Sequence, residues 1–518
     1  MTELRALCVQ ILKECFGEVP SLIGSELSWG PKTLPLLKTS LKLPLSKVTQ
    51  GLVVLISHGI VEFESVKDGL IVQYCLRPNK ILILLRIPRY LVSIESKLGI
   101  ECKLLVEELV QHGRMSLSQM MINVAKRSKA ESGEGKINYV KINEAAVKLV
   151  FKEYLTRLPA LEENQTGNVP IFVNSADLDS FKLPDINLKM IQSIVNEESN
   201  AKPPDHDVIW KMNHRRFDQD LRDEIMIAAV TKRFDAFAGK LMEILLKLMY
   251  ERTSPWQSVS NPIPITLIKD TLVKARVKNY LYANVQQYLK VMENDSSRFV
   301  STSIEGPNNI TVNVKQAIDS ITCTLLDHIV SYRFGDKPRR IFRIIRSKIY
   351  CEQEQIQKIA MVPDKEAKKF TYKLLEENFI QLTQLSRPAA TSAPGPNKVF
   401  YLFHVNLDMV VRMITHQCYQ AMSNAISRRE HEKLENSRLI DKKKRIDEFE
   451  KSLKEQGQSE TAIKEMLDDL MTPPEKTLLE NVNSMFEKLS LAEEQLDETL
   501  IILQFFEHYT RDAIKNDN

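Results

Sequence analysis

One pattern recurs along this chain and restricts its fold more than any other feature: a helix of about three turns leads directly into a β-hairpin. The first example has an apolar helix face over 46–56, a glycine at the helix end, and alternating segments at 60–63 and 70–74 around an Asp-Gly turn. Two further apolar-periodic helices precede it, around 4–12 and 21–27. Three helices followed by a two-stranded ribbon are the plan of a winged-helix domain.

The same order returns three more times, at 143–158, 281–314 and 363–405. The last copy is the clearest, with a helix at 365–377 and strands at 379–385 and 399–405. Glycine is also scarce, at 16 of 518 residues, well below its average share of about 7%, which favours helix. The sequence therefore predicts a mainly α fold with small β wings, built from four tandem extended winged-helix domains.

The pattern changes after residue 407. Two long helical stretches, 407–456 and 475–514, carry apolar residues at three- and four-residue spacing and are separated by Thr472-Pro473-Pro474. Two such arms joined by a turn are typical of an antiparallel coiled-coil hairpin. The predicted domains are winged helix 1 (1–90), winged helix 2 (91–160), a polar, proline-bearing linker (161–206), winged helix 3 (207–335), winged helix 4 (336–406) and the C-terminal hairpin (407–518).

Composition and motif content exclude several classes of protein. No apolar run approaches the ~20 residues that span a bilayer, so a polytopic membrane protein is excluded. The seven cysteines are scattered, without CxxC spacing, which argues against a disulfide framework or a zinc ribbon. The phosphate-loop, dinucleotide, zinc-protease and nucleophile-elbow motifs are all missing. We therefore expect no catalytic residues, no metal and no cofactor.

The net charge of +4 comes from 71 Lys and Arg against 67 Asp and Glu, so any nucleic-acid contact must use local patches. The residues 337–349 place Arg339, Arg343 and Arg346 on one predicted helix face, opposite Ile341, Phe342, Ile345 and Ile349. A second row, Lys365, Lys369 and Lys373, lies on the recognition-type helix of the same domain. Such rows are suited to phosphates. A solvated surface, or a dock for an acidic partner protein, is the alternative.

The first domain offers little for base readout, which usually needs Arg, Asn or Gln on a groove-facing helix. Its exposed helix positions supply only Lys47, Thr49 and Gln50, with Lys67 in the wing. Any DNA contact should therefore depend on backbone and shape rather than on sequence. The candidate DNA or partner contacts are Lys47, Gln50, Lys67, Arg86, Arg89, Arg339, Arg340, Arg343, Arg346, Lys348, Lys365, Lys369 and Lys373.

The order of parts and several short segments resemble one family. The segments are Leu85–Tyr90, Ile341–Ile345, Ala360–Lys368, Phe400–Asn406, Arg428-Arg429 and Gln495–Leu500. They resemble the largest subunit of the RNA polymerase III initiation heterotrimer (the RPC3/RPC62 type), a relative of the TFIIE α subunit. The linker departs from this family, because some members carry a longer and basic segment there.

The resemblance implies a nuclear, non-catalytic polymerase III subunit that acts in transcription initiation and promoter opening, for tRNA and other small RNAs. It also implies two smaller heterotrimer partners, the clamp of the largest polymerase subunit, promoter-bound initiation factors and DNA as contacts. Two alternatives stand beside it. A scaffold of the proteasome-lid or translation-initiation type would contain a single winged unit, and a free winged-helix transcription factor would discriminate strongly between bases.

Overall fold

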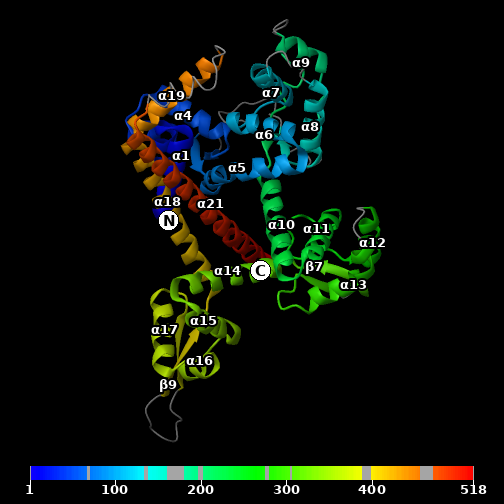
Figure 1. Cartoon of the computed structure of the whole chain (residues 1–518), viewed down its shortest axis with the longest axis vertical. Coiled ribbons are helices and arrows are strands. Elements are labelled where there is room, and N and C mark those ends of the chain that lie inside the picture. Colours follow the sequence, from blue (N-terminus) through cyan, green and yellow to red (C-terminus); the bar gives the residue numbers. More distant parts are fainter. Residues whose placement is uncertain are drawn as a thin grey trace. The chain divides into compact units, whose positions relative to one another are not determined.

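A computed structural model describes residues 2–66, 71–132, 138–159, 180–196, 202–274, 279–303, 306–387, 398–455 and 471–516 (Figure 1). The chain forms two compact units, Met1–Asp218 with Met422–Glu493, and Gln219–Ala421 with Glu494–Asn518. The division falls inside three helices, α10 (His214–Arg233), α18 (Leu407–Glu435) and α21 (Pro473–Asn516). No helix in the described ranges is long and apolar enough to cross a membrane.

The first winged helix opens the first unit. Its elements are α1 (Thr2–Phe16), α2 (Glu18–Leu27), α3 (Leu34–Leu41), α4 (Leu45–Ser57), β1 (Val61–Val66) and β2 (Ile71–Leu76). The predicted apolar face of α4 is buried through Val48, Leu52 and Leu55. Gly59 follows the C-cap of α4 with φ +68°, a left-handed conformation that glycine adopts without strain. β1 and β2 then pair antiparallel, from Val61 opposite Leu76.

The second winged helix closes its sheet with a strand that lies beyond the linker. Its elements are α5 (Pro78–Leu98), α6 (Ile100–His112), α7 (Leu117–Ser132), α8 (Tyr139–Phe151), β3 (Leu155–Arg157), α9 (Leu188–Val195) and β4 (Trp210–Met212). β3 pairs antiparallel with β4, Leu155 opposite Met212, although the sequence placed this wing before residue 160. The linker range also contains α9, which packs on α7 and α8.

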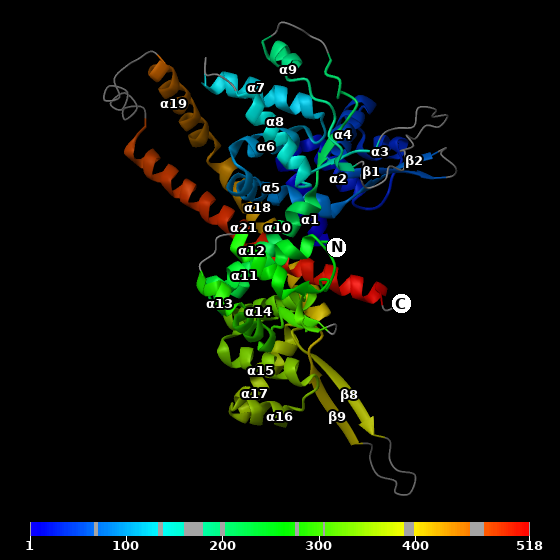
Figure 2. The ribbon, with the colours of Figure 1, turned by 90° about the vertical axis from the view of Figure 1, so that its right-hand side faces the viewer.

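The hairpin contributes its distal half to the first unit. After α18 come α19 (Ser437–Glu455) and, from Pro473, the start of α21. Lys442 pairs with Glu475 at 2.7 Å, and Arg429 with Glu493 at 3.2 Å, so the arms run antiparallel as predicted (Figure 2). Hydrogen bonds from Lys442 and from Thr472, the residue before α21, lower the pKa of Glu475 to about 2.

The second unit holds the third and fourth winged helices. The third consists of α11 (Ala236–Tyr250), β5 (Ile263–Pro264), α12 (Ile265–Lys274), α13 (Asn279–Asn294), β6 (Val300–Ser303) and β7 (Gly306–Val312). The fourth consists of α14 (Val314–Phe334), α15 (Asp336–Lys348), α16 (Gln353–Ala360), α17 (Asp364–Glu376), β8 (Gln381–Arg387) and β9 (Lys398–His404).

The sheets of the second unit are small. The third winged helix has three strands in the order β5-β7-β6, and the fourth has the two-stranded ribbon β8–β9 (Figure 2). Phe379, two residues before β8, packs edge-on against Phe334 and Phe342 at centroid distances of 5.6 and 6.2 Å. With these two, the described residues contain four sheets, each preceded by helices. The single wing expected of a scaffold protein is therefore not observed.

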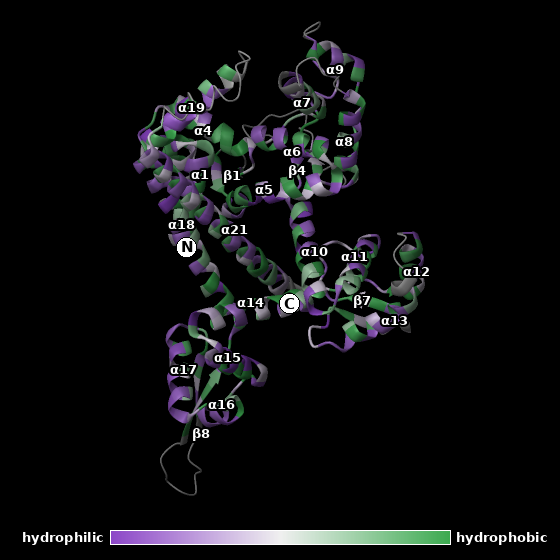
Figure 3. Cartoon of the chain, viewed as in Figure 1, coloured by the Kyte–Doolittle hydropathy of each residue, from purple (hydrophilic) through white to green (hydrophobic). Residues whose placement is uncertain are grey.

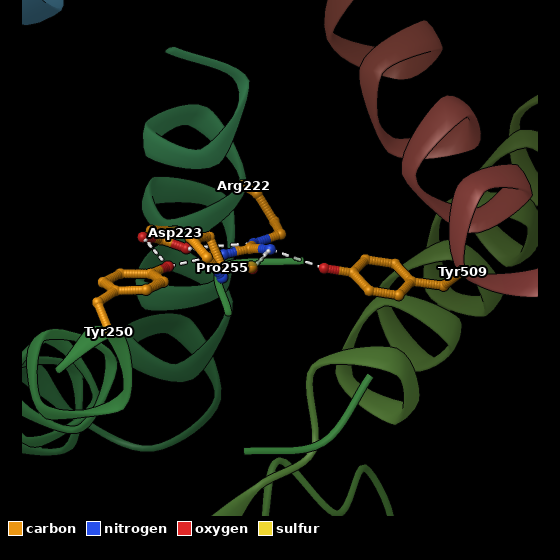
Figure 4. A network of polar contacts seen from close by, with 5 residues as sticks. All are labelled: Arg222, Asp223, Tyr250, Pro255 and Tyr509. Atoms are coloured by element: carbon orange, nitrogen blue, oxygen red, sulfur yellow. Dashed lines mark hydrogen bonds and ion pairs between the residues drawn. The ribbon is translucent and has the colours of Figure 1, made fainter. Parts of the chain in front are cut away.

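A fully buried arginine joins distant parts of the second unit (Figure 4). Arg222 on α10 donates through Nη1 to the Pro255 carbonyl and to the Tyr509 hydroxyl of α21, each at 2.7 Å. Its Nη2 donates to the Tyr250 hydroxyl at 2.6 Å and to Asp223 Oδ1 at 3.0 Å. The end of α21 is thereby fixed to the third winged helix.

Removing this cation is expected to destabilise the second unit strongly. In Arg222→Met the partly buried carboxylate of Asp223 loses its counter-charge, which costs about 3–5 kcal/mol. Tyr509→Phe removes one hydrogen bond and should cost about 1–2 kcal/mol. Urea unfolding of the full chain measures both changes, with Tyr332→Phe as the control because Tyr332 is 94% exposed. Equal stability of the Arg222 and Tyr332 variants would contradict a structural role for the network.

Candidate nucleic-acid interface

The lysine row of the fourth winged helix lies on the outer face of α17. Lys365, Lys369 and Lys373 are all exposed, while Ala367, Thr371 and Leu374 are buried on the opposite face. Figure 3 shows α17 as a largely hydrophilic helix. Lys365 and Lys369 form no ion pair with any described residue; Lys373 Nζ lies 5.3 Å from the centre of the Phe334 ring. The three ammonium groups are thus available to anions.

The arginines of α15 surround an open depression of about 700 Å³ on the fourth winged helix. Its lining residues are Asp336, Arg339, Arg340, Arg343, Ile344 and Ser347. Arg340 and Arg343 are exposed, and Arg339 is partly buried. Arg340 Nη1 also donates to the Ala360 carbonyl at 3.2 Å, which ties α15 to the end of α16. The cationic lining is suited to phosphate oxygens or carboxylates.

Arg346 has a structural role that the helix-face prediction missed. Its guanidinium donates to both carboxylate oxygens of Asp327 on α14, at 2.8 and 3.1 Å, and to the Cys323 carbonyl at 3.3 Å. Asp327 is only 5% exposed, so the pair lies at the α14–α15 interface. Arg343 Nε is 3.5 Å from the same carboxylate, but its side chain is 60% exposed.

The prediction for the apolar face of α15 is correct for three residues and wrong for Ile349. Ile341, Phe342 and Ile345 are buried, as predicted, but Ile349 is 66% exposed. The helix ends at Lys348, and Ile349 takes a positive φ of 67°. The chain therefore leaves the helical path before the apolar stripe reaches Ile349. Lys348 is exposed at the last turn.

The candidates in the first unit separate into exposed and internal residues. Lys47 and Gln50 are exposed on α4, and Lys67 lies outside the described residues. Arg86 was wrongly predicted as a surface contact: it is 4% exposed, with Nη1 3.8 Å from Asp218. Arg89, three residues later, is partly buried.

The spacing of the apolar residues along α5 indicates that Arg86 is buried. Arg86 stands four residues from Leu82 and four from Tyr90, and both of these residues are buried on that helix. The spacing places the arginine in the apolar stripe. Its guanidinium finds Asp218 there, and the Tyr90 hydroxyl donates to the same carboxylate at 2.6 Å.

One basic cluster in the first unit carried no clear sequence signal. Lys80, Arg114, Lys211 and Arg215 line a single pocket, yet only the last two are close in sequence. Four different segments bring these charges together, so periodicity within one helix does not reveal them.

In the described part of the chain, no group of three or more His, Cys, Asp or Glu side chains is arranged to hold a metal ion.

The ion pair between Arg346 and Asp327 leads to a test of how much this pair contributes to stability. Arg346→Ala leaves the buried Asp327 with only the exposed Arg343, whose Nε lies 3.5 Å away, and the free energy of unfolding should fall by about 2 kcal/mol. Lys348→Ala, at an exposed position of the same helix, should leave stability within about 0.5 kcal/mol. Urea unfolding of both full-length variants measures the difference. A stable Arg346 variant would show that the pair with Asp327 is dispensable.

The chain was compared with protein-family models and with known proteins. The model described as "RNA polymerase III subunit RPC82 helix-turn-helix domain" matches 6–66, and "RNA polymerase III subunit RPC82" matches 177–321. "POLR3C, C-terminal winged-helix domain" matches 326–405. "DNA-directed RNA polymerase III subunit RPC3, helical hairpin domain" matches 438–502. The last two matches coincide with the α14–β9 region and with the two helical arms.

Whole-length relatives agree with these matches. The chain is 31% identical to DNA-directed RNA polymerase III subunit RPC3 of Bos taurus, over 96% of this chain and 97% of that protein. The zebrafish protein of the same name, from Danio rerio, is 31% identical over 98% of each chain, and the Homo sapiens protein is 29% identical over 96% and 97%. The chain therefore belongs to the family of DNA-directed RNA polymerase III subunit RPC3.

Proposed function

We propose that this chain is a non-catalytic subunit of DNA-directed RNA polymerase III. The observation that carries the proposal is the similarity to proteins of that name along 96% of the chain. The absence of sequence motifs for phosphate loops, dinucleotide sites, zinc proteases and nucleophile elbows is consistent with a subunit that leaves catalysis to others. A nuclear location follows from membership of this polymerase.

The proposed action is in transcription initiation and promoter opening, through DNA contacts that depend little on base sequence. The lysine row of α17 and the exposed Arg340 and Arg343 of α15 support backbone contacts, because ammonium and guanidinium groups bind phosphate oxygens whatever the base. On α4, Lys47 and Gln50 supply few groups for base recognition. A free, sequence-specific factor is therefore less favoured.

The proposed partners are two smaller heterotrimer subunits, the clamp of the largest polymerase subunit and promoter-bound initiation factors. The distal hairpin supports protein contacts, since several of its large apolar side chains face solvent: Leu434 (68% exposed), Phe449 (45%), Leu478 (54%) and Leu491 (54%). Exposed apolar groups on one element mark surfaces that partner proteins cover.

Depletion of the chain from a nuclear extract tests the proposal. Transcription of a tRNA gene should stop, while transcription by the other polymerases continues. Adding back the purified chain with its co-depleted partners should restore the product. Permanganate reactivity of promoter thymines should be lost and regained in parallel, because these bases react when the duplex opens. Unchanged tRNA synthesis in the depleted extract would contradict the proposed function.

The lysine row has a matched test. The triple variant Lys365→Glu, Lys369→Glu and Lys373→Glu should weaken binding of duplex DNA for every sequence alike. It should also reduce the slope of log affinity against log salt by about 0.9 for each phosphate that a lysine no longer neutralises. The control is Lys240→Glu, Lys274→Glu and Lys290→Glu, three exposed lysines of the same unit. Equal weakening by both triples would show a general charge effect and no interface on α17.

A further inference from the structure

A pocket of about 420 Å³ lies in the first unit. It is formed where the end of α4, the middle of α5, the turn after α6, β4 and the start of α10 meet. The elements belong to the first and second winged helices and to the strand after the linker. None of the candidate DNA contacts named above lines this pocket.

Part of the pocket lining is strongly cationic. Its basic residues are Lys80, Arg114, Lys211 and Arg215. A methyl group placed on Gly59 would lie 3.7 Å from Lys80 Nζ and 3.9 Å from Arg114 Nη2, so two of the cationic groups approach the same point. The side chains of Arg114, Lys211 and Arg215 have no hydrogen bond or ion pair with any described residue.

The nearby carboxylates are already engaged. Asp218, the acidic lining residue, accepts the hydrogen bond of Tyr90 and lies near Arg86. Glu62 accepts from Lys80 at 3.0 Å and from Arg77 at 2.7 Å. The pKa of Lys211 is lowered, first by desolvation and then by repulsion from Lys80 and Arg114. The cations therefore repel one another, and an added anion would relieve that repulsion.

A buried polar atom at the same place also lacks a partner. His214, the first residue of α10, lines the pocket, and its Nδ1 is covered and forms no hydrogen bond in the described structure. Burial, followed by repulsion from Lys80 and Lys211, lowers the pKa of His214 to about 4. The ring is thus neutral at pH 7 and free to donate to an oxygen acceptor. The N-terminus of α10 adds its partial positive charge.

Part of the lining is aliphatic. It includes Ile83, Leu84 and Ile87 of α5, Leu109 and Val110 of α6, and Met212 of β4. No Phe, Tyr or Trp is among the described lining residues. A nucleobase would find no Phe, Tyr or Trp ring on which to stack, and the imidazole of His58 already packs against Phe16 at a centroid distance of 4.8 Å. An aliphatic side chain would remove the apolar surface from water.

We propose that this pocket binds an acidic peptide segment of a partner protein. An apolar side chain of the segment contacts the aliphatic lining residues, and neighbouring Asp or Glu carboxylates pair with Arg114, Lys211 and Arg215. The aliphatic part of the lining and the absence of Phe, Tyr and Trp among the described lining residues favour a peptide over nucleic acid. The site does not depend on which complex the chain joins, and it is separate from the lysine row of α17.

Fluorescence anisotropy with the full chain tests this site. The probe is a labelled twelve-residue peptide in which Glu alternates with Leu. The double variant Arg114→Glu with Lys211→Glu should weaken its binding by about tenfold or more. Lys38→Glu with Lys126→Glu makes the same change of charge at exposed positions outside the pocket, and should leave the affinity within about twofold. If the double reversal fails to fold, Arg114→Gln with Lys211→Gln replaces it.

Two further measurements separate the apolar and ionic contributions. Leu84→Ala, or Ser in place of Leu in the probe, should weaken binding several-fold, because both remove apolar contact. A twelve-nucleotide single-stranded DNA serves as the competing ligand. The proposal is overturned if the peptide shows no saturable binding, if the pocket and control variants bind it equally, or if only the DNA loses affinity in the pocket variant.

Discussion

The second unit is organised around the Arg222 guanidinium, because burying this charge away from water costs free energy unless its donors are paired. An uncompensated buried charge costs several kcal/mol, so the cation is tolerated only while its donors find acceptors. Those acceptors come from Asp223, Tyr250, Pro255 and Tyr509. Tyr509 stands 287 residues further along the chain, so the end of α21 is part of the folded core of this unit.

The same reasoning sorts the basic residues into two kinds. Arginines such as Arg86, Arg222 and Arg346 are turned inward, where the planar guanidinium satisfies several acceptors at once. The lysines of α17 remain in water. The near-neutral net charge of +4 thus hides an uneven distribution, with some cations used for folding and others exposed in rows. Under the proposed function, DNA affinity would come from a few local contacts and from the complex around the chain.

Local pattern predicted most of the fold because winged helices are built from neighbours in sequence. The predicted helix at 365–377 is α17, Asp364–Glu376, and the ribbon β8–β9 follows where expected. The second wing was mispredicted because β3 pairs with β4 across about fifty residues, and period-two alternation carries no information about a distant partner. Spacing identified the exposed lysine row, and the spacing of α5 also carried a signal for the burial of Arg86. It could not reveal the acidic partners of Arg86 and Arg346, which lie on other helices. The pocket around Lys211 depends wholly on such tertiary placement.

The central claim is that this chain acts as a subunit of RNA polymerase III. The direct measurement is purification of the chain, tagged at its own chromosomal locus, followed by mass spectrometry of the proteins that remain bound at moderate salt. The expected result is near-stoichiometric recovery of RNA polymerase III subunits, including the largest subunit and two smaller heterotrimer partners. Recovery of the chain alone, or with proteasome-lid or translation-initiation subunits, would contradict the claim.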